Sequence, residues 1–303
     1  MLRQRSMLRH SRQTANPLRL EPLESRTLLS VRTVSALIDG APGSLRDVVN
    51  QSQAGDVIQF SPQLRGAVIP ITEGEIAIDR SLTIAGTRQT LDADFSSRIF
   101  SIQGPDVAVT IRNLTFTEGL ATLDEANGYV GGAILVNGAS LTVMHSHFVD
   151  NAAVGGGDSP STFVYRAAGG AVFGLNSSLN FMQTTFVANT AFGGENTRNE
   201  QAGEALGGAV TAIFSSLQIQ GGHFSDNLAQ GGDAVNPLDA FPSSGGGFAG
   251  GGAIYGVETS LSARGVHFAN NRALGGKGLD GSLTPPDSQE VGDGGTAAGG
   301  AIQ

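Results

Sequence analysis

Short stretches in which apolar and polar residues alternate recur along the chain from residue 131 onward. In each stretch the first and third residues are apolar and the middle residue is polar, which is typical of a β-strand with one buried face. The four stretches are Leu141-Thr142-Val143, Leu179-Asn180-Phe181, Leu217-Gln218-Ile219 and Leu261-Ser262-Ala263. A solenoid of helices would need a period of about 3.6 residues and few glycines, so the pattern favours strands.

Each stretch lies inside a constant unit of 26 residues that reads GGA[IV], then SL, then FxxNxAxGG, from 131 to 156 in the first copy. The unit starts at Gly131, Gly169, Gly207 and Gly251, and a further copy begins at Gly299. Three short strands separated by turns fit one coil of a parallel β-helix. The sequence therefore predicts an all-β fold, a right-handed single-stranded parallel β-helix of the pectate-lyase-like solenoid type over residues 57–303.

Stacking of such coils predicts a position for each repeated side chain. The β-branched row Ile134, Val172, Val210 and Ile254 should face inward, and the next row, Leu135, Phe173, Thr211 and Tyr255, should point outward. A phenylalanine ladder inside the coils should comprise Phe116, Phe148, Phe186, Phe224 and Phe268. An asparagine ladder, whose amides bond along the stack at a turn, should comprise Asn151, Asn189, Asn227 and Asn271.

Only the segments between the units vary in length. They cover residues 157–168, 195–206, 233–250 and 277–298, which are 12, 12, 18 and 22 residues long. Loops tolerate such variation because the entropy of loop closure grows slowly with length. Since all four leave the coil at the same corner, they should line one side of the rod, and this wall of loops is the predicted contact face.

Residues 31–56 are predicted to form an N-terminal cap with a short helix over residues 44–54. Ser44 can cap the helix, Leu45, Val48 and Val49 fall on one face, and Gly55 suits the stop. A short amphipathic helix can cover the open end of a strand stack. The segment from Val34 to Ser61 resembles the CSLREA-type segment that often precedes bacterial β-helices.

Residues 1–30 differ from the rest, because they are rich in arginine and show no period-two alternation. Their last part, LEPLESRTLLS from Leu20 to Ser30, resembles the LEPR-XLL motif near the N-terminus of many large exported bacterial proteins. The resemblance implies a basic, disordered export or targeting segment and an extracellular or cell-surface location. The alternative is a disordered basic tail without a targeting role.

The GGA[IV]…FxxN pairing over residues 131–302 resembles the repeats of the polymorphic outer membrane protein family. Those repeats form β-helical passengers of surface autotransporters, so the resemblance implies a non-enzymatic adhesion, binding or structural module with a surface glycan or a protein as ligand. The chain stops at GGAIQ, three residues into a first strand, which suggests that the helix is incomplete at its C-terminal end. The oligomeric state is left open.

Composition narrows the chemistry. The formal charge of −9 argues against nucleic acid as the partner, and the absence of cysteine excludes thiolate nucleophiles and Cys-ligated metals. No apolar run is long enough for a membrane span. The outward residues His147, His223 and His267, with Thr185 in the remaining slot, should form a solvated ladder, although stacked imidazoles can also bind metal.

An enzyme is the alternative function, since parallel β-helices often cleave acidic polysaccharides with clustered carboxylates. No catalytic residue and no cofactor is assigned. The acids of this chain concentrate in the variable segments, where solvated loop charge is the simpler interpretation. Calcium candidates stand in glycine-rich contexts at Asp158, Asp233, Asp280 and Asp293.

Overall fold

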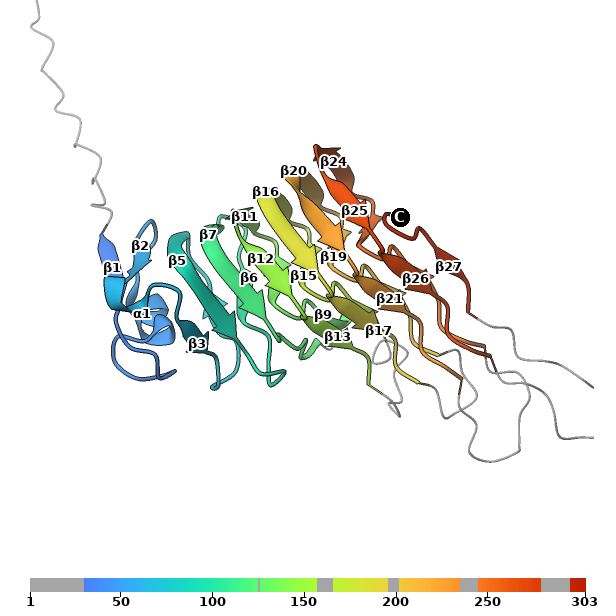
Figure 1. Ribbon diagram of the computed structural model, residues 1–303, viewed down its shortest axis with the longest axis horizontal. Coiled ribbons are helices and arrows are strands. Elements are labelled where there is room, and N and C mark those ends of the chain that lie inside the picture. The colour runs from blue at the N-terminus through green and yellow to red at the C-terminus, as the bar shows by residue number, and fades with distance from the viewer. Residues whose placement is uncertain (1–29, 125, 157–165, 196–201, 235–244, 279–294) are drawn as a thin grey trace, which may run out of the picture.

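The computed structural model describes residues 30–124, 126–156, 166–195, 202–234, 245–278 and 295–303. These residues form mostly β-strands, arranged in four sheets that run along the molecule. Figure 1 shows the strands side by side in chain order, from blue at the N-terminal end to red at the C-terminal end. The prediction of a mostly β fold built from parallel strands is confirmed.

We name the four sheets A to D. Sheet A contains β1 (Val31–Val34), β2 (Val57–Phe60), β3 (Val68–Pro70), β5 (Leu82–Asp92), β7 (Ala108–Thr117), β11 (Ser140–Met144), β12 (His147–Val149), β16 (Ser178–Val187), β20 (Ser216–Ser225), β24 (Ser260–Arg264) and β25 (His267–Ala269). Sheet B contains β4 (Ile76–Ile78), β6 (Phe100–Gln103), β10 (Ile134–Asn137), β15 (Val172–Leu175), β19 (Val210–Ile213) and β23 (Ile254–Val257).

The other two sheets are built from strands of only two or three residues. In the repeats these strands follow the phenylalanine. Sheet C contains β13 (Ala152–Val154), β17 (Thr190–Phe192), β21 (Leu228–Gln230) and β26 (Arg272–Leu274). Sheet D contains β8 (Leu123–Asp124), β9 (Gly128–Val130), β14 (Ala167–Ala168), β18 (Ala205–Leu206), β22 (Ala249–Gly250) and β27 (Ala297–Ala298). Only β8 and β9 pair in antiparallel fashion among the strands described.

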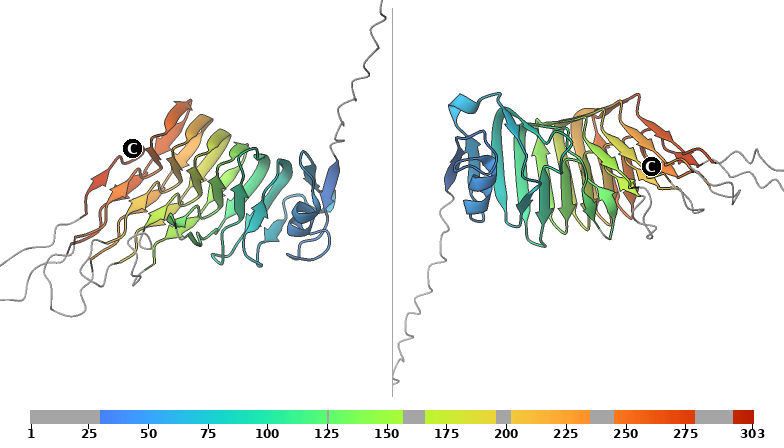
Figure 2. Two further views of the ribbon diagram at one scale, coloured as in Figure 1. Left: turned by 180° about the vertical axis from the view of Figure 1, so that it is seen from behind. Right: turned by 90° about the horizontal axis from the view of Figure 1, so that it is seen from below.

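Successive strands of one repeat enter different sheets. β10 lies in sheet B, β11 and β12 in sheet A, β13 in sheet C and β14 in sheet D, after which β15 returns to sheet B. Equivalent residues pair across the repeats, so that Ile134 is in register with Val172 and Val172 with Val210. Each sheet is therefore a stack of the same strand from consecutive repeats, as Figure 2 shows from two further sides.

The main core lies between sheets A and B. Phe148, Phe186 and Phe224 are fully buried there, together with the β-branched row Ile134, Val172, Val210 and Ile254. The rings of Phe116, Phe148, Phe186, Phe224 and Phe268 stack in sequence, with centroid distances of 4.6, 4.8, 4.5 and 5.2 Å. Neighbouring rings are tilted by at most 20°, so the structure brings all five phenylalanines of the ladder together.

The row after the β-branched positions faces away from the main core, but it is not exposed. Leu135 is 5% exposed, Phe173 1% and Thr211 0%. Tyr255 is half-buried. The predicted alternation is therefore confirmed, but the outward side chains are covered by other residues instead of lying in solvent.

A second core explains the burial of this row. Strands of sheet D pack against the outer side of sheet B, where Val130, Ala168 and Leu206 contact Leu135 and Phe173. The hydroxyl of Thr211 donates to the carbonyl of Leu206 at 2.6 Å, so its polar atom is satisfied inside this core. The sequence pattern could not show this cover, because a two-residue strand carries too few positions for a period.

The N-terminal cap contains the helix α1 (Leu45–Gln51). Within the described ranges, no helix is long and apolar enough to cross a membrane. The Ser44 side chain accepts a hydrogen bond from the Asp47 N–H at 3.2 Å, which confirms the predicted N-cap. The helix ends at Gln51, with Ser52 as its C-cap, so the predicted end at residue 54 is wrong. Leu45, Val48 and Val49 are buried in the main core, at the N-terminal end of the strand row (Figure 1).

Two buried carboxylates hold the cap. Asp39 receives the Arg46 guanidinium through Nε and Nη2, at 2.9 and 2.8 Å, and the backbone N–H of Thr72. Burial alone would raise the pKa of Asp39, but these hydrogen bonds outweigh it and lower the pKa. Asp56 receives the Gln53 N–H, the Ser30 hydroxyl and the Arg32 guanidinium, which hold its pKa well below the ordinary value of 3.8.

Acid should therefore loosen the cap. Because the pKa of Asp56 is depressed in the folded state, its contribution to stability is complete above the ordinary value of 3.8 and is lost as the pH falls below it. Asp56→Asn should lower the melting temperature at pH 7 and flatten its decline in acid, measured by circular dichroism from about pH 7 to about pH 2. The exposed Asp79→Asn is the control, and an unchanged pH profile in Asp56→Asn would contradict the assignment.

Candidate interaction surface

The asparagine ladder lies at the corner where the chain passes from sheet A to sheet C. Asn151, Asn189 and Asn227 are buried, and each side-chain amide donates to the side-chain oxygen of the next asparagine at 2.8–3.0 Å, ending at Asn271. Each amide also donates to the carbonyl of the phenylalanine one repeat earlier, for example Asn189 to Phe148 at 3.0 Å. The corner is thereby fixed at the same place in every repeat.

Beyond this corner, sheets C and D pack face to face through alanine. Ala153, Ala191 and Ala229 of sheet C contact Ala167 and Ala205 of sheet D, and all five are fully buried. Side chains this small bring the two backbones close together. The layer between the sheets thus becomes thinner, from the phenylalanine core between sheets A and B to the alanine layer between sheets C and D. The constant alanine of FxxNxAxGG allows this close packing.

The position of sheet D corrects the boundaries of the variable segments. The predicted ranges 157–168, 195–206, 233–250 and 277–298 end in strands β14, β18, β22 and β27, which pair in register from repeat to repeat. These strands belong to the constant repeat. The parts that lie outside the described residues are 157–165, 196–201, 235–244 and 279–294.

Past the alanine layer, the outgoing and returning chains meet at glycines. We call the set Gly194, Gly203, Gly232, Gly247, Gly276 and Gly295 the glycine stem. Its backbone hydrogen bonds run alternately between returning and outgoing chains, from Gly203 N to Gly194 O, Gly232 N to Gly203 O, Gly247 N to Gly232 O, Gly276 N to Gly247 O and Gly295 N to Gly276 O, at 2.7–2.9 Å. The two layers are thus joined into one ladder.

Only glycine fits in the stem. A Cβ atom on Gly232 would lie 2.0 Å from the carbonyl oxygen of Gly194, and one on Gly276 would lie 1.8 Å from that of Gly232. Neither glycine has a positive φ, so the requirement comes from the approach of neighbouring backbones and not from the local conformation. This close packing explains the Gly-Gly pair that ends the constant units at residues 194, 232 and 276.

Gly232→Ala should destabilise the protein by about 1–3 kcal/mol, because the added methyl group forces neighbouring backbones apart. Gly256→Ala is the matched control, since it also has no positive φ and its Cβ would meet nothing nearer than 3.6 Å. Chemical denaturation measures both variants, and amide exchange at Gly203 and Gly247 reports local opening of the stem. Equal stability of the two variants would show that the stem tolerates side chains.

Charged residues stand where the chain enters and leaves the variable segments. Arg166 and Glu204 form an ion pair at 3.0 Å between β14 and β18. Burial first, and then the charge of Glu204, raises the pKa of the Tyr255 phenol. The Asp233 carboxylate accepts the backbone N–H of Lys277 at 2.8 Å, which ties two neighbouring segments together at their bases.

The calcium hypothesis reaches the described residues at only one position. Asp233 is engaged with Lys277, whereas Asp158, Asp280 and Asp293 lie outside the described residues. Within the ranges that the structure describes, no group of three or more His, Cys, Asp or Glu side chains is placed to hold a metal ion. Calcium therefore stays a prediction from the sequence.

An acidic corner lies between sheets A and C in the earlier repeats. Burial, followed by the charges of Asp92, Asp94 and Asp150, raises the pKa of Glu118. Glu118 and Asp150 have positive φ values of 52° and 54°, so they occupy equivalent left-handed turn positions of successive repeats. This corner was not predicted, because its members are separated in the chain and only the stacking brings them together.

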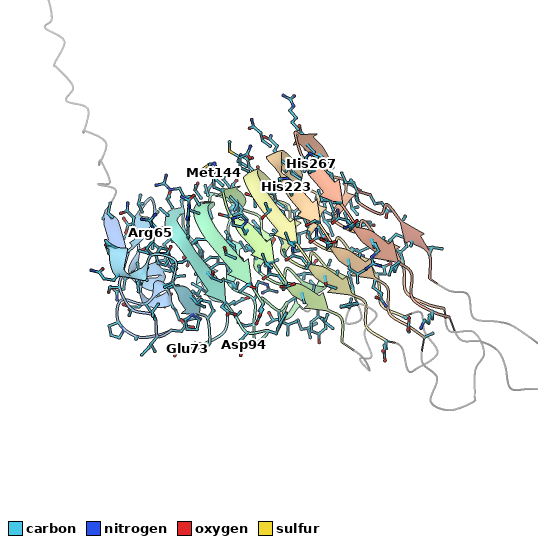
Figure 3. The ribbon with its side chains drawn as sticks, in the orientation of Figure 1. Arg65, Glu73, Asp94, Met144, His223 and His267 are labelled. Carbon is cyan, nitrogen blue, oxygen red and sulfur yellow. The ribbon has the colours of Figure 1, made fainter. Side chains whose placement is uncertain are left out.

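The outer face of sheet A carries the histidines. His147, His223 and His267 are exposed and occupy the same column, and Thr185 in the remaining position bonds His147 Nδ1 at 2.6 Å. The rings of His223 and His267 stack with a centroid distance of 5.5 Å. Figure 3 shows these two histidines next to one another on β20 and β25.

The returning half of the glycine stem was not predicted either, although the sequence carries a signal for it. Gly203, Gly247 and Gly295 each stand four residues before the Gly-Gly pair of the next unit, since 207−203, 251−247 and 299−295 are all 4. Aligning the repeats on their starts, rather than treating the whole interval as loop, would have revealed this position.

Comparison of the chain with protein-family models, with curated proteins and with solved structures finds no match in any of the three. The function therefore has to be argued from the geometry of this chain.

Proposed function

We propose that the chain is a right-handed parallel β-helix that works outside the cell or at its surface as a non-enzymatic binding or structural module. Its contact face is the wall formed by the segments 157–165, 196–201, 235–244 and 279–294, and its ligand is a surface glycan or a protein. The export-like stretch Leu20–Ser30 and the likeness of the repeats to surface passengers support the location. Both are sequence arguments.

The glycine stem is the observation that carries this proposal. It holds the start and the end of the segments 196–201, 235–244 and 279–294 in one ladder, with hydrogen bonds of 2.7–2.9 Å within and between neighbouring repeats. Bases fixed this closely give consecutive segments a common origin, whereas their lengths and sequences are free to differ. A row of variable segments on a rigid scaffold is a typical arrangement for recognition.

The test is to shorten all four segments to short Gly-Ser connections while leaving both halves of the stem unchanged. Trimmed and intact chains are applied to a glycan array and to immobilised extracellular-matrix proteins. The trimmed chain should keep its melting temperature, because the sheets, the ladders and the glycine stem are left unchanged, and it should lose the retention that the intact chain shows. Equal retention of both chains would move the contact face to the sheets, and retention of neither would contradict a binding role.

The acidic corner favours a second candidate, a carbohydrate-active β-helix of the lyase or glycosidase type. A carboxyl group whose pKa is raised by burial and by neighbouring acidic side chains is the arrangement from which general acids are built, and Glu118 is such a group. Incubation with polygalacturonate and with alginate, followed by assays for unsaturated products and new reducing ends, tests this candidate. Cleavage that is lost in Glu118→Gln but kept in the trimmed chain would replace the first proposal by the second.

A further inference from the structure

Metal-binding side chains other than carboxylates are concentrated on one face of the protein. All four histidines and both methionines of the described residues lie on the outer face of sheet A or beside it, at His145, His147, His223, His267, Met144 and Met182. Outer strand positions are otherwise occupied mainly by serine, threonine, asparagine and glutamine. Imidazole and thioether groups are ligands of late transition metals rather than of calcium or magnesium.

We propose that the stacked pair His223 and His267 is a binding site for a late first-row transition metal ion, of the class of Cu²⁺, Ni²⁺ or Zn²⁺. The two residues are in register on neighbouring parallel strands β20 and β25. Their rings are nearly parallel, with an angle of 15° and a centroid distance of 5.5 Å. The sheet thus fixes the two imidazoles side by side before any ion binds.

The geometry requires only a small rearrangement of side chains. A metal–nitrogen bond is about 2.0–2.1 Å long, so two nitrogens that share one ion lie at most about 4 Å apart. Both rings are exposed, and rotation about their side-chain torsions can bring one nitrogen of each within this distance without moving the backbone. Binding therefore breaks no packing of the core.

A glycine leaves space beside one member of the pair. Gly265 stands two residues before His267, and a Cβ atom at this position would meet nothing within 4 Å. Water molecules can complete the coordination there, as in other sites with few protein ligands. Arg264, three residues before His267, carries a like charge, so the expected affinity is moderate rather than tight.

The same column contains an internal control. His147 is exposed in the equivalent position, but its neighbour in the next repeat is Thr185, whose hydroxyl bonds His147 Nδ1. His147 is thus a single imidazole in the surroundings that His223 and His267 share. If the site depends on the pair, replacing His147 should leave the metal affinity unchanged. If cations are attracted to surface histidines in general, the same replacement should weaken binding.

The test is isothermal titration of the full chain with the chloride salts of Cu²⁺, Ni²⁺ and Zn²⁺, in a buffer that does not bind metal and with His10→Ala in every variant. One ion should bind per chain. His267→Ala should weaken binding on the order of tenfold or more, because one of two anchoring imidazoles is lost, whereas His147→Ala should leave the affinity unchanged. Thr185→His should add a second ion, since it joins His147 to the pair.

Three results would overturn the site: no binding by the parent chain, equal affinity of His267→Ala, or equal weakening by His147→Ala. Melting temperatures of all variants should match that of the parent, because the exchanged side chains are exposed. A variant that melts earlier is replaced by His223→Gln, which keeps a polar side chain in the column.

Discussion

Phe186→Ala is expected to lower the free energy of unfolding by about 3–5 kcal/mol, the usual range for emptying a buried aromatic site. Phe186 is fully buried and its ring stacks on Phe148 at 4.8 Å and on Phe224 at 4.5 Å. The ring of Phe181 is perpendicular to it, with a centroid distance of 5.1 Å. The cavity cannot collapse easily, because the strands on both sides keep a fixed spacing through their backbone hydrogen bonds.

Equilibrium denaturation in urea measures this loss, and Phe192→Ala is its control. Phe192 lies six residues further along the chain, but it is 36% exposed on the outer side of sheet C. Its truncation should cost far less, because little cavity forms at the surface. Similar losses for the two variants would mean that the stacked rings are not the centre of the core.

Asn189→Ala is expected to cost about 3 kcal/mol, because several buried hydrogen bonds are lost together and their partners stay buried. The Asn189 amide donates to the Phe148 carbonyl and to Asn227 Oδ1, and its oxygen accepts the backbone and side-chain N–H groups of Asn151. The bonds of the ladder all point the same way along the stack, so each polarises the next.

Asn180→Ala is the control for the ladder, since Asn180 lies on the outer side of β16 and is half-buried. Asn189→Asp gives a sharper comparison, because it keeps the size of the side chain but removes the donor to Phe148 and places a charge in the ladder. Both Asn189 variants should unfold at lower urea concentration than Asn180→Ala. If Asn189→Asp is as stable as the parent at neutral pH, the ladder does not depend on amide donors.

The parts of the fold that were predicted from the sequence are those in which the same residue type returns at a constant spacing. Phenylalanine and asparagine at constant spacing indicated two ladders, and alternation around Leu141 and Leu179 indicated strands. The facing of Leu135 and Phe173 was predicted correctly, but the layer that covers them was not, because the alternation tells which side a residue faces and not what lies on that side. Its cover comes from two-residue strands such as Ala167–Ala168, inside an interval that resembled a loop.

The candidate surface was predictable only in outline. Constant glycines before residues 157 and 195 marked where the chain leaves the repeat, but their role depends on backbones from other repeats, such as Gly232 against Gly194. The acidic corner around Glu118 and the pairing of His223 with His267 likewise arise from register between distant residues. A residue-by-residue pattern does not contain such contacts, and they emerge only when the repeats are stacked.

The close spacing of the glycine stem also sets an upper limit on the bulk that neighbouring repeats can carry. Consecutive bases lie one strand apart, about 4.8 Å, whereas a folded domain of 100 residues is roughly 26 Å across, twice its radius of gyration of about 13 Å. Two adjacent repeats therefore cannot both accept an inserted domain, although each can accept a single extended peptide. For protein engineering, the stem can therefore present several different peptides side by side at very high local density. A receptor that meets one peptide meets its neighbours at the same time.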